Sequence, residues 1–170
     1  MDSSELFEIR FTIQQMTNDS AMAIADWIYT PPYDFYNAVP DDPDLADFLN
    51  PEFRHGRYYE TVAEYYGLVG FFEFKHEKDP LEIGLGLRPD LTGKGLGLRF
   101  VQAGMAFARS HFGVSHLCLT VATFNQRAIT VYERAGFRPV TTYMHHTNGA
   151  DYEFLRMISE LATRIDADPA

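Results

Sequence analysis

The most constraining feature of this chain is a glycine-rich turn between a run typical of a strand and a run with helical periodicity. Residues 81–87 read LEIGLGL, and apolar side chains recur on one helical face over residues 96–111. The turn between them reads TGKGLG, residues 92–97. A helix begins with unpaired backbone N–H groups at the positive end of its dipole, and glycines let an anion approach the main chain closely. The sequence therefore predicts an anion site suited to a phosphate group, with Lys94 at its rim.

The spacing within this turn excludes two common nucleotide-binding loops. A Walker A loop needs a first glycine where Arg88 stands, and Ser or Thr where Gly95 follows Lys94. The dinucleotide fingerprint needs G-x-G-x-x-G, whereas residues 93–97 read G-x-G-x-G and follow no candidate βαβ unit. Two interpretations remain, namely a loop that binds another polyphosphate and a glycine turn without a ligand.

Hydrophobic periodicity along the rest of the chain predicts a single α/β domain. The expected strands are residues 7–15, 58–65, 68–74, 81–87, 116–121, 137–145 and 152–158, and the expected helices are residues 18–29, 45–49, 96–111 and 125–135. Asn18, Asp19 and Ser20 offer caps for the first helix, which Pro31-Pro32 should end. This order predicts a mixed sheet rather than an all-parallel one. We expect one domain over residues 1–160 and a frayed tail over residues 161–170.

Charge is distributed unevenly along the chain. The net charge is −10, but residues 1–82 hold 17 acidic against 5 basic side chains, and residues 83–170 hold 7 against 9. A net negative chain argues against a nucleic-acid partner. The acidic half suits a cationic partner and the other half a polyanion. The alternative is that the acidic excess only keeps the surface solvated.

Two further features bear on compartment and chemistry. The first ten residues lack the basic and apolar stretches of a secretory signal, and no later apolar run approaches the roughly 18 residues of a membrane span. We therefore expect a cytoplasmic protein without membrane association. Cys118 is the one cysteine, so no internal disulfide and no cysteine-based metal site is expected. It lies within the apolar alternation HLCLTV, which is typical of a buried structural residue.

A second motif follows about thirty residues after the glycine turn. The segment NQRAITVYERAGF places Asn125, Ala128 and Tyr132 on one face of a helix. With both motifs, the segment 82–140 resembles the acetyl-CoA-binding core of the GNAT superfamily of N-acetyltransferases, and the order of elements fits that fold over nearly the whole chain. Thr92 stands where families of this type usually carry Gln or Arg. The resemblance rests on the two motifs together, since either one alone is weak.

The resemblance implies a GNAT fold, with a mixed, mostly antiparallel sheet flanked by helices and with splayed central strands. The pantetheine arm of acetyl-CoA would lie between those strands, and Gly84 and Gly86 would permit a bulge beside it. Backbone groups near Leu85 and Leu87 would pair with the arm or polarise the acetyl carbonyl. The expected cofactor-binding residues are Leu85, Gly86, Leu87, Thr92, Gly93, Lys94, Gly95, Leu96, Gly97, Asn125, Ala128 and Tyr132. No metal site is expected.

The resemblance also implies direct attack of an amine on the thioester, without an acyl-enzyme and without Cys118. Tyr132 would protonate the departing thiolate; the alternative is an aromatic residue that only packs its helix on the sheet. Asn125 would bind the cofactor arm and cap its own helix, and the two roles are compatible. Glu82 resembles the general base of some GNAT branches, although strand parity places it opposite Leu87. Weaker alternatives for the base are His145, His146 and Glu153.

The aromatic segment WIYTPPYDFYN, residues 27–37, is the expected acceptor side. Aromatic faces beside a carboxylate suit a cationic amine, so the expected substrate residues are Trp27, Tyr33, Asp34 and Tyr36. The alternative is that these rings only cover one side of the core. The expected function is acetyl transfer to a small amine, an aminoglycoside-like polyamine or a peptide N-terminus. A sensor that binds acyl-CoA without turnover, a purely structural domain and a homodimer remain open.

Overall fold

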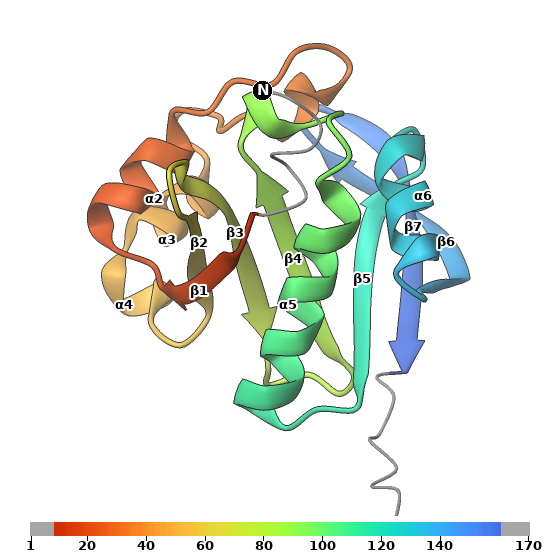
Figure 1. Cartoon of the computed structure of the whole chain (residues 1–170). Coiled ribbons are helices and arrows are strands. Elements are labelled where there is room, and N and C mark those ends of the chain that lie inside the picture. Colours follow the sequence, from red (N-terminus) through yellow and green to blue (C-terminus); the bar gives the residue numbers. More distant parts are fainter. Residues whose placement is uncertain (1–8, 161–170) are drawn as a thin grey trace, which may run out of the picture.

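The protein is described from a computed structural model, which describes residues 9–160. Its centre is a seven-stranded sheet in the order β1-β2-β3-β4-β5-β7-β6 (Figure 1). The strands are β1 (Phe11–Gln15), β2 (Tyr58–Ala63), β3 (Gly67–Lys75), β4 (Leu81–Leu87), β5 (His116–Ala122), β6 (Arg138–Thr147) and β7 (Ala150–Glu160). All neighbouring strands are antiparallel except β4 and β5. The mixed, mostly antiparallel sheet predicted from the sequence is confirmed.

The sheet splits between its two parallel strands. β4 and β5 pair only at Leu81 with Leu117 and at Glu82 with Cys118. β4 nevertheless keeps its pairing with β3 over all of residues 82–87, and β5 keeps its pairing with β7 over residues 116–122. Each strand is therefore held on its outer side, while the inner sides separate beyond Glu82. The expected splay of the central strands is confirmed.

Helices cover both faces of this sheet. They are α2 (Asn18–Ala25), α3 (Pro43–Leu49), α4 (Pro51–Arg54), α5 (Gly97–Phe112) and α6 (Gln126–Arg134), with 3₁₀ turns η1 (Tyr33–Tyr36) and η2 (Pro89–Leu91). Phe72 packs in the cluster that contains the apolar side of α5, whereas Phe71 packs against the cluster of α2. Adjacent residues of a strand point to opposite faces, so α5 and α2 lie on opposite sides of the sheet. α6 lies beside α5 (Figure 1).

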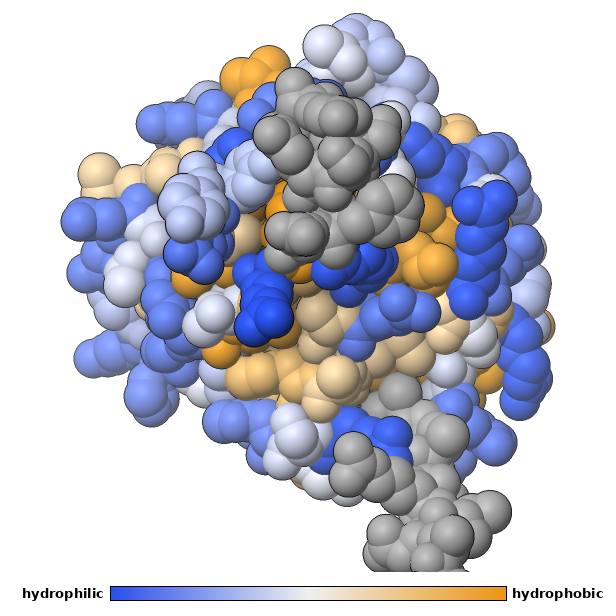
Figure 2. All heavy atoms as spheres, viewed as in Figure 1, coloured by the Kyte–Doolittle hydropathy of each residue, from blue (hydrophilic) through white to orange (hydrophobic). Residues whose placement is uncertain are grey.

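The face that carries α5 closes the main apolar core. Phe100, Val101 and Ala108 of α5 are almost fully buried against the sheet. Hydrophilic residues surround paler, more apolar ones along the middle of this face (Figure 2). None of the helices in residues 9–160 is long and apolar enough to cross a membrane.

Several element boundaries differ from the sequence predictions. The first helix ends at Ala25 rather than at Tyr29, and its cap is Thr17, whose hydroxyl accepts a hydrogen bond from the Ser20 N–H at 3.1 Å. Thr17 is itself held by the Glu60 carboxylate, a contact across the sheet that local sequence does not reveal. The predicted tail over residues 161–170 lies outside the described residues.

Candidate active site

A cavity of about 540 Å³ opens where β4 and β5 separate. Its walls are residues 83–87 of β4, residues 119–122 of β5, the start of α6, and the segment that joins α2 to α3. Phe71 and Glu73 of β3 and Tyr58 of β2 complete the lining. The split in the sheet thus forms a cavity that reaches from the glycine loop to the α2 side.

β4 turns polar backbone groups toward the split. The Arg88 N–H donates to the Val69 carbonyl at 2.8 Å, so the backbone polar groups of Arg88 point toward β3. The N–H and C=O groups of successive residues point to alternate sides of a strand. Those of Leu85 and Leu87 therefore point to the side where β5 has separated. The Leu87 carbonyl accepts a hydrogen bond from the Tyr29 hydroxyl at 2.8 Å. Leu85 therefore offers backbone groups to a ligand in the cavity.

The glycines of β4 do not produce the expected bulge, because the β3–β4 register runs without a shift. They instead leave room for side chains of β3. A Cβ at Gly86 would lie 2.3 Å from the Phe71 ring, and a Cβ at Gly84 would lie 3.3 Å from Glu73 Oε2. Two β3 side chains therefore lie over the glycines and line the cavity.

The glycine loop precedes α5 as the sequence predicts. Gly93 and Gly95 have φ values of 70° and 83°, which side chains disfavour. No backbone carbonyl among the described residues accepts a hydrogen bond from the N–H of Gly93, Lys94 or Gly95. Thr92 lines the cavity, whereas the Leu96 side chain is buried in the core. The loop thus offers main-chain donors at the N-terminus of a long helix, which is the geometry of an anion site.

Arg127, which the sequence reasoning missed, adds a cation beside this loop. Its Nη1 lies 3.6 Å from the position that a Cβ at Gly93 would take, and its guanidinium lies 4.0 Å from the Tyr33 ring centroid. Arg127 also lines the cavity. A basic residue two positions after the Asn125 cap was the available signal, but its direction depends on how α6 packs beside α5.

Asn125 and Tyr132 lie on the α6 wall of the cavity. The Asn125 side-chain carbonyl accepts from the Ala128 N–H at 3.1 Å, so Asn125 caps α6, and its amide donates to the Tyr36 hydroxyl at 3.1 Å. The Tyr132 ring packs edge-on against Phe137, with centroids 6.1 Å apart. Burial raises the pKa of the Tyr132 phenol, and nearby Tyr36 adds to this effect. The Tyr132 phenol is thus neutral at physiological pH.

The opposite end of the cavity is aromatic and acidic. The Phe48 ring lies 5.2 Å from Tyr58 and 6.1 Å from Phe71, measured between centroids. Three carboxylates line this end, from Asp42, Asp44 and Glu73. Such an end suits a cationic ligand.

The predicted substrate residues are only partly brought together. Trp27, Tyr33 and Tyr36 line the cavity. Asp34 does not, because it is exposed and lines a neighbouring hollow of about 530 Å³. The sequence reasoning missed Asp42, since an Asp before Pro43 is adequately explained as a helix cap, and this Asp does accept from the Asp44 N–H at 2.9 Å.

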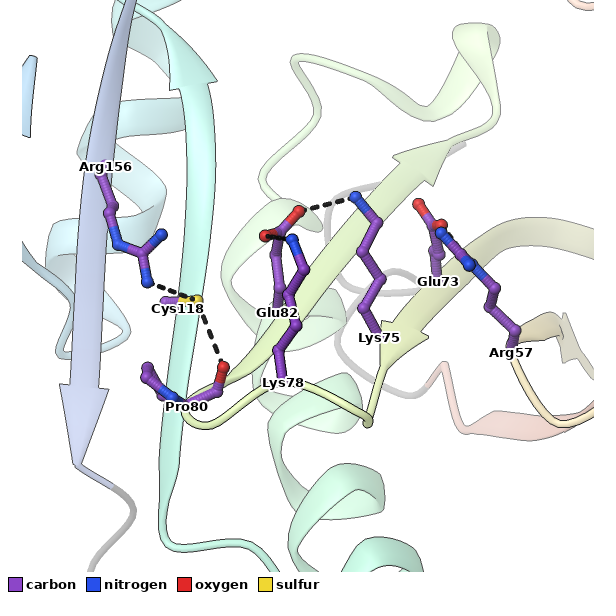
Figure 3. A network of polar contacts seen from close by, with 8 residues as sticks. All are labelled: Arg57, Glu73, Lys75, Lys78, Pro80, Glu82, Cys118 and Arg156. Carbon is purple, nitrogen blue, oxygen red and sulfur yellow. Dashed lines mark hydrogen bonds and ion pairs between the residues drawn. The ribbon is translucent and has the colours of Figure 1, made fainter. Parts of the chain in front are cut away.

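Glu82, the predicted base, is not part of the cavity lining. Its carboxylate is bound by Lys75 Nζ at 2.7 Å and Lys78 Nζ at 3.1 Å (Figure 3). Burial opposes ionisation of Glu82, but the hydrogen bonds and charges of the two lysines outweigh it and lower its pKa. A lowered pKa makes a carboxylate a weaker proton acceptor.

The weaker candidates for the base also lie elsewhere. His145, His146 and Glu153 are exposed on β6 and β7, and none of them lines the cavity. His146 contacts Asp151 at 2.7 Å. Within residues 9–160, no group of three or more His, Cys, Asp or Glu side chains is placed to hold a metal ion.

Comparison with known proteins agrees with this geometry. The family model described as "Acetyltransferase (GNAT) domain" matches residues 10–138. Spermidine N(1)-acetyltransferase of Escherichia coli (strain K12) is 28% identical over 153 residues, which cover 88% of this chain and 79% of that protein. Mycothiol acetyltransferase of Propionibacterium freudenreichii subsp. shermanii is 43% identical over 58 residues, 34% of this chain and 18% of that protein.

Solved structures share the fold at low sequence identity. A spermidine N-acetyltransferase chimera from Vibrio cholerae and hSSAT has a TM-score of 0.73 at 18% identity, covering 88% of this chain and 95% of that one. A GNAT-family acetyltransferase from Bacillus anthracis has a TM-score of 0.68 at 16% identity, covering 89% and 95%. With the family match over most of its length, the chain belongs to the GNAT family of acetyltransferases and is an acetyl-CoA-dependent acyltransferase.

Proposed function

We propose that the protein transfers the acetyl group of acetyl-CoA directly to a primary amine of a small cationic molecule. The observation that carries this proposal is a single cavity with two unlike ends. One end adjoins main-chain donors and Arg127, and the other end has three carboxylates among aromatic rings. The first suits a polyanionic donor and the second a cationic acceptor.

The donor end fits acetyl-CoA by the chemistry of its groups. The backbone of residues 92–97 and the Arg127 guanidinium would hold the pyrophosphate, and Thr92 would contact the cofactor from the cavity wall. Backbone groups of Leu85 and Leu87 and the faces of Asn125 and Ala128 would flank the pantetheine arm. A backbone N–H directed at the acetyl carbonyl stabilises the charge that forms on its oxygen, an effect of about 2.7–4 kcal/mol in measured cases.

The transfer needs no covalent intermediate on the protein. Cys118 is 1% exposed and lies outside the cavity lining, and its thiol donates to the Pro80 carbonyl at 3.6 Å. The acceptor amine would attack the thioester carbon directly. Tyr132 would then give its proton to the departing thiolate, a role that its place on the cavity wall supports. Burial raises the pKa of its phenol, so the proton to be given is present at neutral pH.

For the acceptor, we infer a small linear amine with more than one positive charge. The carboxylates of Asp42, Asp44 and Glu73 exceed what one ammonium group requires. Rings of Trp27, Phe48, Tyr58 and Phe71 would cover the methylene chain between the charges. The spermidine acetyltransferase of Escherichia coli, named for such an acceptor, aligns with most of this chain and supports the same inference.

The experiment is a thiol-release assay of the purified protein with acetyl-CoA and a panel of amines. The panel contains spermidine, an aminoglycoside, a monoamine, free amino acids and a peptide with a free N-terminus. We expect amine-dependent thiol release that is fastest with the polyamine, and mass spectrometry of the product should show one added acetyl group. The reaction without amine is the control. Absence of thiol release with every amine would contradict the proposed function.

A further inference from the structure

One carboxylate lies at the inner end of the cavity, where the splayed strands meet. Glu73 of β3 pairs with Gly84 of β4, two residues beyond the last β4–β5 pair at Glu82. Because Gly84 has no side chain, the Glu73 carboxylate can lie over β4; Oε2 is 3.3 Å from the position a Cβ would take. Of the three carboxylates that line the cavity, Glu73 is thus the one next to the start of the split, whereas Asp42 and Asp44 come from the α3 side.

Two neighbouring residues hold this carboxylate in place, Tyr58 at the start of β2 and Arg57 directly before it. Arg57 Nε donates to Glu73 Oε1 at 2.7 Å, and the Tyr58 hydroxyl also hydrogen-bonds to the Glu73 side chain. The Arg57 guanidinium lies 4.7 Å from the Phe53 ring centroid, which fixes its own position. An ionised carboxylate has about four acceptor positions, so these two donors leave room for a third. Figure 3 shows Arg57 beside Glu73.

The neighbouring carboxylate on the same face is differently placed. Glu82, Gly84 and Gly86 share one face of β4 because they alternate with the buried residues Leu81 and Ile83. Glu82 uses both of its oxygens on lysines, one on Lys75 and one on Lys78 (Figure 3). Of these two glutamates, Glu73 lines the cavity and Glu82 does not.

We propose that Glu73 binds the reacting ammonium group of the acceptor and takes its proton, with Arg57 as its positioning residue. This inference rests on the proposed function. The ammonium group gives a proton to the Glu73 carboxylate, directly or through one water molecule. The freed lone pair attacks the acetyl carbonyl and the new C–N bond forms. The nitrogen then loses its second proton to solvent, the C–S bond breaks, and Tyr132 protonates the departing thiolate. Glu73 then releases its proton to solvent, and solvent reprotonates Tyr132, so the net products are the amide, CoA and one proton.

The test compares isosteric variants of three glutamates. Glu73→Gln should lower kcat/KM for the best acceptor of the panel by about 10²–10⁴-fold, the usual contribution of a positioned proton acceptor. The fold-decrease in kcat/KM caused by Glu82→Gln should be at least about tenfold smaller than that caused by Glu73→Gln. Glu64→Gln, at an exposed position of the turn after β2, serves as the matched charge control and should match the wild type. The affinity for acetyl-CoA, measured by calorimetry, should be the same in all three variants.

The positioning role of Arg57 is tested by how its variants change KM and kcat. Arg57→Ala should raise KM for the amine and lower kcat, and Arg57→Lys should restore part of the loss because it returns a donor and a charge. In the double variant with Glu73→Gln, the two losses should not add, because Arg57 acts through Glu73. Loss of acetyl-CoA affinity or of thermal stability in parallel with activity would instead assign Arg57 a purely structural role.

A binding measurement separates this inference from the proposed function. Spermidine is titrated into the wild type and into Glu73→Gln without acetyl-CoA, and we expect weaker binding to the variant. If the wild type acetylates amines and Glu73→Gln does so equally well, the inference fails and the proposed function stands. A larger loss in Glu82→Gln than in Glu73→Gln would also overturn the inference. If the wild type neither binds nor acetylates any amine, the proposed function itself fails.

Discussion

Among single residues, Tyr132 is the acid of the transfer that we propose. It lines the cavity, and burial raises the pKa of its phenol, so the proton stays bound at neutral pH. Tyr132→Phe removes the hydroxyl and keeps the ring that packs on Phe137. We expect kcat to fall by about 10²–10⁴-fold, with the melting temperature and acetyl-CoA affinity unchanged. Steady-state kinetics and thermal unfolding measure the two effects.

A Tyr132→Phe variant with full turnover on its acceptor would show that the ring has only a packing role. A companion variant, Tyr143→Phe, removes a hydroxyl from an exposed strand residue and controls for the general effect of that change. It should leave kcat at the level of the wild type.

The sequence predicted some residues of the site better than others, for a physical reason. Ala128 and Tyr132 follow Asn125 by three and seven residues, and helix geometry alone places all three on one wall of the cavity. Glu73 and Arg127 depend on contacts between elements, since one lies over a glycine of the next strand and the other reaches a loop that precedes another helix. Spacing along the chain contains no information on such contacts.

At the level of elements, the element types of β4 and α2 were predicted correctly, but the role of the β4 glycines and the cap of α2 were not. The alternation in β4 correctly predicted a strand, but its glycines were expected to form a bulge. They accommodate Phe71 and Glu73 from the neighbouring strand instead. The cap of α2 was assigned to the wrong residue, because Thr17 is held in the capping position by a contact with Glu60, a residue distant in sequence. Element types could be predicted from periodicity, whereas these details are fixed by tertiary contacts.

Gly104 in α5 provides a test of packing against helix propensity. Alanine is the better helix former by about 1 kcal/mol, so propensity alone predicts that Gly104→Ala is stabilising. A Cβ at Gly104, however, would lie 2.3 Å from the Phe72 ring, which is fully buried and stacked on Phe100 at 4.5 Å. Overpacking of this kind costs about 1–3 kcal/mol. We therefore expect Gly104→Ala to lower the free energy of unfolding.

Urea unfolding and thermal melting measure the effect of Gly104→Ala. A net loss of about 1 kcal/mol corresponds to a melting temperature lower by about 2–4 °C for a chain of this size. Gln102→Ala, at an exposed position of the same helix, is the control and should change the free energy of unfolding by less than about 0.5 kcal/mol. A stabilised Gly104→Ala would mean that Phe72 can move aside at little cost.

At the level of the whole molecule, the order of strands and helices was largely predictable, because each element has its own periodicity. The split between β4 and β5 was expected from the family resemblance, and periodicity alone would not have revealed it. The sheet can stay split because β4 and β5 are each paired along their outer sides. The long pairing partners β3 and β7 thus make it possible for the two central strands to diverge and form the cavity.

The uneven charge of the chain leads to a prediction about ionic strength. Residues 1–82 contribute all three carboxylates of the acceptor end and hold 17 acidic against 5 basic side chains. The field of such a surface concentrates polycations, and its reach falls from about 30 Å in 0.01 M salt to about 8 Å in 0.15 M salt. Over this range of salt, at saturating acetyl-CoA, kcat/KM for spermidine should therefore fall more steeply than kcat/KM for a monoamine of similar length. Equal salt dependence of the two amines would show that the acidic half only solvates the surface and does not attract the acceptor.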